Sequence, residues 1–235
     1  GKVKKRYKGG PGDRDLKHNF IVTMLKTKNG DIYLGTGNAL HRFDRKLDNF
    51  VKIDLFDNLF VSSLLEDHKG TIWVGTHSGG VLYFNPETNV RGHLMNDPAN
   101  KNSLTTNTIN ALFEDSFQNL WIATEGGGLC QLDKARKKIT RFTIKNGLPS
   151  NFIFKVLEDN QQSLWITTSK GLVNFNASRN TPVVYTKANG LLNDQFNYNS
   201  GYKDEEGRLY FGSVRGMITF TPGGFYQNKF IGPVF

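Results

Sequence analysis

The chain has one cysteine and no long apolar run. Cys130 is the only thiol among 235 residues, so no internal disulfide can form. It stands in an apolar stretch with no histidine near it in sequence, which favours buried packing over a reactive role. No run of about 18 apolar residues exists, and the first residues lack the apolar region of a signal peptide. We therefore expect no membrane contact from this chain.

Signatures of catalysis and metal binding are also missing. The sequence contains no Gly-x-Ser-x-Gly elbow, no His-Glu-x-x-His motif and no P-loop. Residues 126–128 form a glycine run, which we interpret as a turn rather than a phosphate cradle. The five histidines show no short metal-ligand spacing. The Asp-x-x-Gly turns lack the alternating oxygen ligands of a calcium loop. We expect no catalytic residues, no metal and no cofactor.

Negative charge is in the minority. The formal net charge is +9, which favours anionic partners through long-range attraction. The basic residues are scattered, apart from a cluster in residues 2–8 that we interpret as a solvated end. No nucleic-acid partner is predicted.

The main feature of the sequence is a pattern that repeats five times. A polar turn precedes a short apolar strand with an aromatic residue near its centre, and these aromatic residues are spaced 40, 48, 44 and 45 residues apart. They are Tyr33, Trp73, Trp121, Trp165 and Tyr210. A period in the forties with strand-rich text is typical of a β-propeller with one blade per repeat.

The second repeat shows how one blade is built. Residues 60–65, 71–76, 81–84 and 90–94 have the composition of strands, and turn residues such as Asp67 and Gly70 separate them. Asn119 and Ser163 are interpreted as replacing that turn glycine in the third and fourth repeats. Because the tryptophans keep the same strand position in each repeat, we interpret them as core residues rather than as platforms for sugar stacking.

The predicted fold is all-β, with five four-stranded blades over residues 3–222 and a tail over residues 223–235. The fifth repeat lacks an obvious fourth strand. Residues 3–7 resemble an outer strand and are expected to pair beside residues 217–221, or beside another molecule. Two alternatives remain open: the five blades close on themselves, or they were cut from a longer array.

The repeats resemble the two-component regulator propeller family. The resemblance rests on an Asp-x-x-Gly turn, a Leu-Trp-Ile-Gly-Thr strand, and a Gly-Leu pair followed by an aromatic residue before Asp or Asn. These elements occur at residues 67–85, 120–133 and 164–176, and the connectors at residues 146–152 and 189–196 also fit.

The resemblance implies a non-catalytic, periplasmic sensor region of a hybrid two-component system. Such regions usually carry two seven-bladed propellers, a β-sandwich, a membrane helix and a histidine kinase. The five repeats are then expected to be a fragment of a larger propeller array, with residues 223–235 leading into a β-sandwich. The implied partners are an oligosaccharide, acidic ones included, the neighbouring propeller and β-sandwich, and a second copy in a homodimer.

Ligand binding is expected where the repeat frame varies. The residues that follow each second strand differ in charge and size, and the repetition places them on one propeller face near the axis. The candidate ligand-binding residues are His77, Glu125, Ser169, Lys170 and Arg215. This mixture suits a hydroxyl-rich or carboxylated sugar, with Lys170 and Arg215 holding an anionic group. Ordinary solvated loop residues are the alternative interpretation.

Two other classes of function stay open. A propeller lyase would need an acid-base group on one face, for which His77, Glu125 and Arg215 are the candidates. A protein-interaction scaffold would need neither, and a propeller fold by itself does not decide between these functions.

Overall fold

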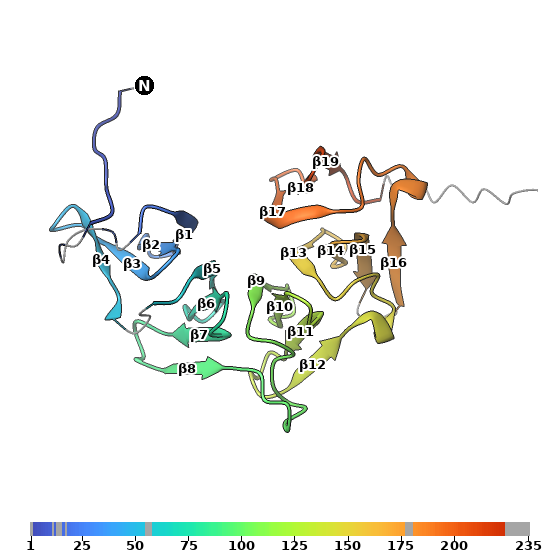
Figure 1. The fold of residues 1–235 in the computed structure, drawn as a ribbon, viewed down its shortest axis with the longest axis horizontal. Coiled ribbons are helices and arrows are strands. Elements are labelled where there is room, and N and C mark those ends of the chain that lie inside the picture. Colours follow the sequence, from blue (N-terminus) through green and yellow to red (C-terminus); the bar gives the residue numbers. More distant parts are fainter. Residues whose placement is uncertain are drawn as a thin grey trace, which may run out of the picture.

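A computed structural model describes residues 2–10, 12, 16, 18–54, 58–176 and 181–223. Five antiparallel sheets follow one another around an arc, with the first strand of each sheet on the inside of the arc (Figure 1). Two short 3-10 helices, η2 (Ile144–Asn146) and η3 (Lys187–Asn189), lie in the connectors that precede the fourth and fifth sheets. The prediction of an all-β propeller is confirmed.

Each blade begins with its innermost strand and proceeds outward. The first blade contains β1 (Ile21–Lys26), β2 (Ile32–Thr36), β3 (Leu40–Asp44) and β4 (Asn49–Lys52). The second contains β5 (Val61–Glu66), β6 (Ile72–Thr76), β7 (Val81–Phe84) and β8 (Arg91–Leu94). The third contains β9 (Ile109–Glu114), β10 (Leu120–Thr124), β11 (Leu129–Leu132) and β12 (Ile139–Phe142).

The fourth blade contains β13 (Ile153–Glu158), β14 (Leu164–Thr168), β15 (Gly171–Asn176) and β16 (Thr181–Tyr185). The fifth contains β17 (Phe196–Lys203), β18 (Leu209–Ser213) and β19 (Gly216–Phe220), and no fourth strand among the described residues. All five aromatic marker residues lie in second strands, as predicted.

The predicted pairing of residues 3–7 with residues 217–221 is wrong. Residues 2–8 have no strand structure, and the segment instead contacts the first blade. The Tyr7 ring packs edge-on against Phe43 and Phe50, and Lys5 forms an ion pair with Asp48. The chain thereby adds apolar cover to the first blade, and β19 keeps a free edge among the described residues. The tail predicted to lead into a β-sandwich lies outside the described residues from residue 224 on.

An aspartate organises the turn that enters the second strand in four of the five blades, and Thr27 takes its place in the first. Oδ1 of Asp67 accepts hydrogen bonds from the backbone N–H groups of Lys69 and Thr71, and Oδ2 accepts one from Nε1 of Trp73 at 2.9 Å. The same aspartate–aromatic bond recurs at 2.7, 2.8 and 2.9 Å in Asp115–Trp121, Asp159–Trp165 and Asp204–Tyr210. One carboxylate therefore fixes both the turn and the central ring of the strand that follows it.

The left-handed position of this turn was misassigned from the sequence. Gly70 has φ 74°, and its counterparts in the third and fourth blades are Gln118 at 69° and Gln162 at 61°. Asn119 and Ser163 come one residue later, where the backbone N–H groups donate to Asp115 and Asp159. Hydrogen bonds to the aspartate hold the glutamine backbone in the left-handed region, which residues with a side chain rarely adopt.

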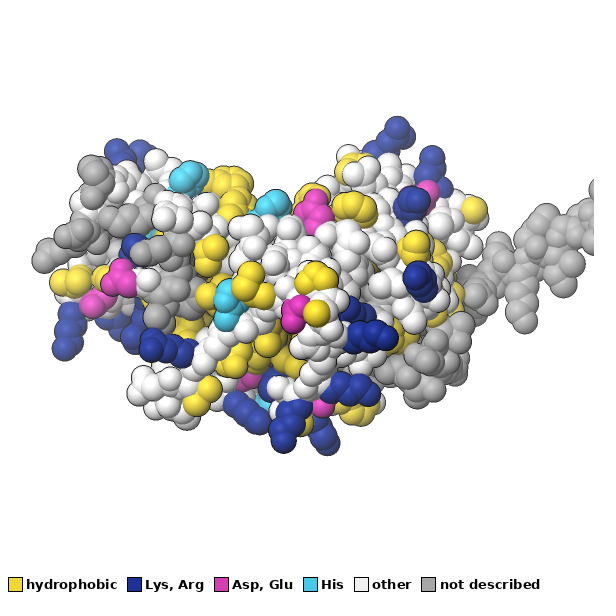
Figure 2. Space-filling model, turned by 60° about the horizontal axis from the view of Figure 1, so that its bottom comes forward, with side chains coloured by type: hydrophobic (Ala, Val, Ile, Leu, Met, Phe, Trp, Pro, Cys, Tyr) yellow, Lys and Arg dark blue, Asp and Glu magenta, His cyan; other side chains and the backbone are white. Residues whose placement is uncertain are grey.

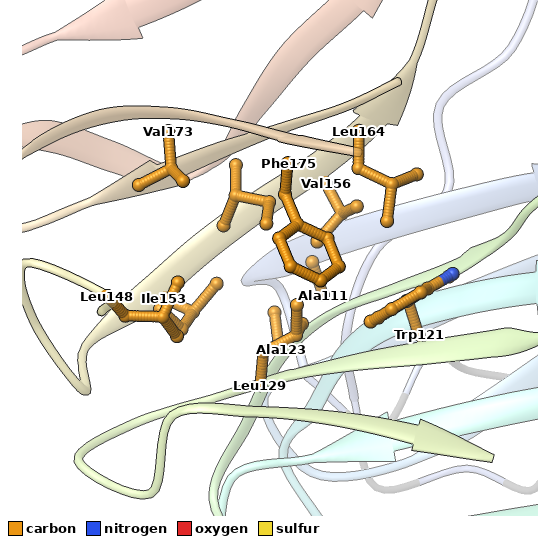
Figure 3. Packing of buried hydrophobic residues seen from close by; sticks show 11 residues of the cluster. Ala111, Trp121, Ala123, Leu129, Leu148, Ile153, Val156, Leu164, Val173 and Phe175 are labelled. Atoms are coloured by element: carbon orange, nitrogen blue, oxygen red, sulfur yellow. The ribbon is translucent and has the colours of Figure 1, made fainter. Parts of the chain in front are cut away.

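The core lies between neighbouring blades. Trp121 packs with Val156, Leu164 and Phe175 in a buried cluster shared by the third and fourth blades (Figure 3). Trp73 and Trp165 occupy the same place at the next interfaces on either side. Small residues in the second strand allow this close approach, since a Cβ at Gly75 would lie 2.8 Å from Ile109 Cγ2. The prediction that all three tryptophans are core residues is confirmed.

A second contact links successive blades at the turn end. A glutamate at the end of an innermost strand accepts a hydrogen bond from the turn of the preceding blade. Lys28 N donates to Glu66, His68 N to Glu114, and Ser116 N to Glu158, at 2.7, 2.7 and 2.9 Å. Side-chain packing and these hydrogen bonds together set the angle between blades.

The face of the fifth blade that has no following blade among the described residues carries an apolar residue at the position that is buried in the other four blades. Met217 is 60 % exposed, whereas its counterparts in the other four blades are 1 % exposed or less. These counterparts are Leu40, Val81, Leu129 and Leu172.

Truncating Trp121 should strongly destabilise the protein. Trp121→Ala removes a ring that is 1 % exposed and leaves the Asp115 carboxylate without its indole donor. We expect a loss of about 3–5 kcal/mol in the free energy of unfolding, measured by urea denaturation with circular dichroism. Phe117→Ala is the control, since its ring is 54 % exposed and its loss should cost about 0.5 kcal/mol or less. Equal losses in both variants would contradict the packing account.

Asp67 should make stability depend on acid pH. Burial opposes its charge, but hydrogen bonds from Trp73, Thr71, Lys69 and Arg136 hold its pKa below the usual value. Its stabilising contribution is complete above the unfolded pKa of about 3.9 and disappears as pH falls through the lower folded pKa. Unfolding of wild type and Asp67→Asn from pH 7 to pH 2 should therefore show a smaller acid-induced loss in the variant. Parallel curves would contradict this assignment.

Candidate functional site

The five variable positions lie at equivalent places on one end of the blades. His77 N donates to Phe60 O at 3.0 Å, Glu125 N to Thr108 O at 3.0 Å, and Ser169 N to Phe152 O at 3.2 Å. The first and fifth blades repeat this bond as Gly37 N to Phe20 O and Val214 N to Gln195 O. We call the surface formed by these paired residues, with Lys170 and Arg215, the axis face.

The axis face begins where each second strand ends in a Thr or Ser. Thr76 Oγ1 donates to Gly80 O and accepts a hydrogen bond from Gly79 N, which shapes the turn into the third strand. Because this hydroxyl makes the hydrogen bonds that fix the turn, the side chain of the next residue is free to vary.

Three polar side chains from different blades meet on this face. Glu125 Oε2 lies 3.6 Å from Nε2 of His77, and Glu125 Oε1 accepts a hydrogen bond of 3.4 Å from the Tyr198 hydroxyl. His77 belongs to the second blade, Glu125 to the third and Tyr198 to the fifth. Oε2 is shielded from solvent and accepts no hydrogen bond from the described residues. The carboxylate therefore has unused acceptor capacity.

Tyr198 lies in an irregular part of its strand. In β17 the pairing register shifts between Phe196 and Gly201, a longer interruption than the one between Val61 and Ser63 in β5. Burial, the negative charge of Glu125 and the hydrogen bond to it raise the pKa of the Tyr198 phenol.

Aromatic rings continue the axis face on both sides of this cluster. The ring centroids are 6.4 Å apart for His18–Phe20, 6.1 Å for Phe20–Phe60 and 5.5 Å for Phe60–His77. On the far side, Phe154 packs edge-on against Tyr198 at 4.7 Å. Hydrophobic, histidine and acidic side chains lie beside one another along the hollowed margin between the end blades (Figure 2).

The phenylalanines of this row were missed in the sequence, although a signal was present. Phe20, Phe60 and Phe152 each stand at the end of a crossing loop, directly before the innermost strand. The crossing loops that end at Phe20 and Phe60 were expected on this face, but their rings were not singled out as site residues. Phe20 is 57 % exposed and Phe152 is 44 % exposed.

The remaining predicted site residues stay apart from the His77–Glu125 pair. Ser169 Oγ hydrogen bonds with Ser150 Oγ at 2.7 Å. The backbone N–H groups of Lys170 and Arg215 donate to Thr168 Oγ1 and Ser213 Oγ, and both side chains are exposed. Within the described part of the chain, neither cation forms a hydrogen bond or ion pair with this cluster.

An acidic cluster at the opposite end of the blades is already neutralised. Asp67, His68 and Glu114 place ligand atoms close together, as in a metal site. However, Nη2 of Arg136 lies 3.2 Å from Asp67 Oδ2 and 2.5 Å from Glu114 Oε1, and the guanidinium covers the Trp73 ring. A cation thus already fills this place, and the cluster joins the second and third blades.

Two other chemically distinctive groups also have structural roles. Burial raises the pKa of the Cys130 thiol, which is fully buried as expected and unsuited to nucleophilic chemistry. Burial lowers the pKa of Lys155, whose Nζ donates to Asn199 at 2.7 Å between the fourth and fifth blades. A cavity of about 470 Å³ beside β3 and β4 is lined by Arg42, Asp44, Arg45 and Lys46, far from the axis face.

The sequence comparison finds a known repeat in three of the blades. The family model of the two component regulator propeller matches residues 54–78, 103–126 and 147–170. Three of the five repeats thus resemble two-component regulator propeller repeats. In the structure these matches cover the turn, the second strand and the axis-face residue of the second, third and fourth blades.

A curated relative contains the same kind of segment. The chain is 25 % identical over 267 residues to Histidine kinase P4 of Formosa agariphila, covering 89 % of this chain but 19 % of that protein. The chain thus spans about a fifth of this relative.

Solved structures show the fold. The extracellular domain of a hybrid two component system from B. thetaiotaomicron has a TM-score of 0.68 at 24 % identity, covering 87 % of this chain and 34 % of that one. PorZ, a type-IX secretion system surface component of Porphyromonas gingivalis, has a TM-score of 0.72 at 17 % identity, covering 94 % and 35 %.

Enzymes share this fold as well. Virginiamycin B lyase from Staphylococcus aureus has a TM-score of 0.61 at 11 % identity, covering 86 % of this chain and 70 % of the lyase. At such identity the likeness concerns architecture only. No helix of the described residues is long and apolar enough to cross a membrane.

Removing the charge of Glu125 should lower the pKa of Tyr198. Glu125→Gln keeps the shape of the side chain but abolishes the charge that disfavours the phenolate. NMR titration with ¹³Cζ-labelled tyrosine should show the Tyr198 pKa falling toward about 10. Tyr185 is the control, because burial alone raises its pKa and the substitution should leave it unchanged. An unaltered Tyr198 titration would show that the two side chains do not meet in solution.

Proposed function

We propose that this chain is a non-catalytic recognition module in the periplasmic sensor region of a hybrid two-component system. The observation that carries the proposal is the combination of two-component regulator propeller repeats with a polar and aromatic axis face that the repeat frame does not require. The histidine kinase relative and the extracellular two-component domain of the same fold support it.

The ligand we propose is an oligosaccharide. The axis face combines hydrogen-bonding groups with aromatic surface, which suits a molecule that has many hydroxyls and apolar ring faces. The site comprises His77, Glu125, Ser169, Lys170 and Arg215, with Tyr198 and the phenylalanines added by the structure. The net charge of +9 would also assist the approach of an acidic chain.

Ligand binding would be transmitted to the kinase through neighbouring domains of the parent protein. We propose that the blades belong to a longer array followed by a β-sandwich and a kinase, in which homodimers carry the response. The exposed Met217 and the free edge of β19 support contact with a further unit of the parent protein.

A lyase-like enzyme or a protein scaffold has less support. The lyase shares the fold at 11 % identity, and the His77–Glu125 pair has no contact with Arg215 among those described.

Calorimetric titration with neutral and acidic oligosaccharides tests this function. We expect at least one glycan to bind the wild type, and His77→Ala or Arg215→Ala to weaken that binding about tenfold, the effect of losing one charged or polar contact. Lys134→Ala is the control, because this exposed lysine lies in the β11–β12 turn at the opposite end of the blades. Unchanged affinity in both axis-face variants would move the site elsewhere, and no binding by any glycan would reject the ligand class.

A further inference from the structure

We propose that the axis face binds a neutral sugar ring, which stacks on the phenylalanines of the first two blades and donates hydroxyl hydrogen bonds to Glu125. This inference rests on the proposed function and names the class of sugar and the residues that select it. It differs from the sequence-based expectation, in which Lys170 and Arg215 hold an anionic group.

The first argument is that the fold does not need these rings. Phe20 and Phe60 accept a backbone hydrogen bond from Gly37 and His77, and Thr108 and Gln195 accept the equivalent bond in the third and fifth blades. The repeat therefore provides its own comparison: a polar residue serves the architecture equally well at this position. Phe20 is 57 % exposed and Phe60 is half-buried. An exposed aromatic ring that the architecture does not require is typical of a binding surface.

The second argument is that the rings and the polar cluster form one continuous surface. Contacts run from His18 through Phe20 and Phe60 to His77, then through Glu125 to Tyr198. Phe20 and Tyr198 are 57 % and 58 % exposed, and the His77 side chain is 56 % exposed. The rings are tilted to one another by 54–77°, so a single exposed ring such as Phe20 offers the stacking surface. An apolar ring face beside hydrogen-bonding groups matches a pyranose, which has C–H groups on its faces and hydroxyls at its rim.

The third argument concerns charge. Glu125 Oε1 has only a long hydrogen bond from the Tyr198 hydroxyl, so it can accept from ligand hydroxyls. A sugar carboxylate or sulfate at this place would be repelled by Glu125. Lys170 and Arg215 make no described contact with the cluster. The groups around the rings thus favour a neutral ring.

The experiment is calorimetric titration with cellohexaose, xylohexaose, mannohexaose and laminarihexaose as neutral probes, and trigalacturonate as the acidic probe. We expect a neutral probe to bind, with affinity about tenfold lower in Phe60→Ala, Phe20→Ala and Glu125→Gln. Phe117→Ala and Tyr202→Ala are controls, because both rings are exposed away from this row and their loss should leave affinity unchanged. Because the Phe20 ring is exposed, Phe20→Ala should fold normally. It therefore tests the inference even if Phe60→Ala fails to fold.

The outcomes separate this inference from the proposed function. Binding of a neutral probe that Phe20→Ala and Phe60→Ala leave intact would overturn the inference alone. Binding of trigalacturonate only, lost in Arg215→Ala, would also overturn it and leave the sensor function standing. Failure of the wild type to bind any probe would overturn both.

Discussion

The hydrogen bond between a turn aspartate and the ring of the following strand is the interaction on which this molecule depends. One carboxylate satisfies two turn N–H groups and the indole of Trp73, and the arrangement repeats at Asp115 and Asp159. A buried indole without a partner would cost free energy, so the aspartate makes burial of the large ring favourable. With the ring fixed, it can fill the space between its own blade and the next.

The distance between blades follows from this. Trp121 reaches into a cluster with the fourth blade, while Gly75 and Ala123 keep the second strands narrow enough for contact. Glutamates such as Glu114 join the turns of successive blades at the same end. The requirements of folding are thus concentrated in the interfaces and in the turn end. The opposite end of each blade is closed by a Thr or Ser hydroxyl and by backbone hydrogen bonds, which leaves the side chains of the axis face open to variation.

The contrast between the two ends explains where binding chemistry can arise. At the turn end, Arg136 forms ion pairs with Asp67 and Glu114, so these two carboxylates already have a cationic partner within the protein. On the axis face, the Glu125 carboxylate makes only long contacts with His77 and Tyr198, and aromatic rings stay exposed beside it. Groups with unused hydrogen-bonding capacity next to exposed rings can gain from a ligand, whereas satisfied ion pairs cannot.

The sequence by itself determined the blades, their order and the burial of Trp73, Trp121 and Trp165, because a repeated pattern reports local strand and turn preferences many times over. It also placed His77 and Glu125 on one face, since equivalent positions in a repeat share an environment. It could not place residues 3–7, because a preference for an extended conformation does not determine which strand or blade they contact. In the structure they contact the first blade. Only the tertiary structure decided that Tyr198 reaches Glu125, because this contact joins the fifth blade to the third and depends on how the arc of blades curves (Figure 1). Likewise, the exposure of Phe20 and Phe152 depends on how neighbouring blades surround them, and no local pattern encodes that.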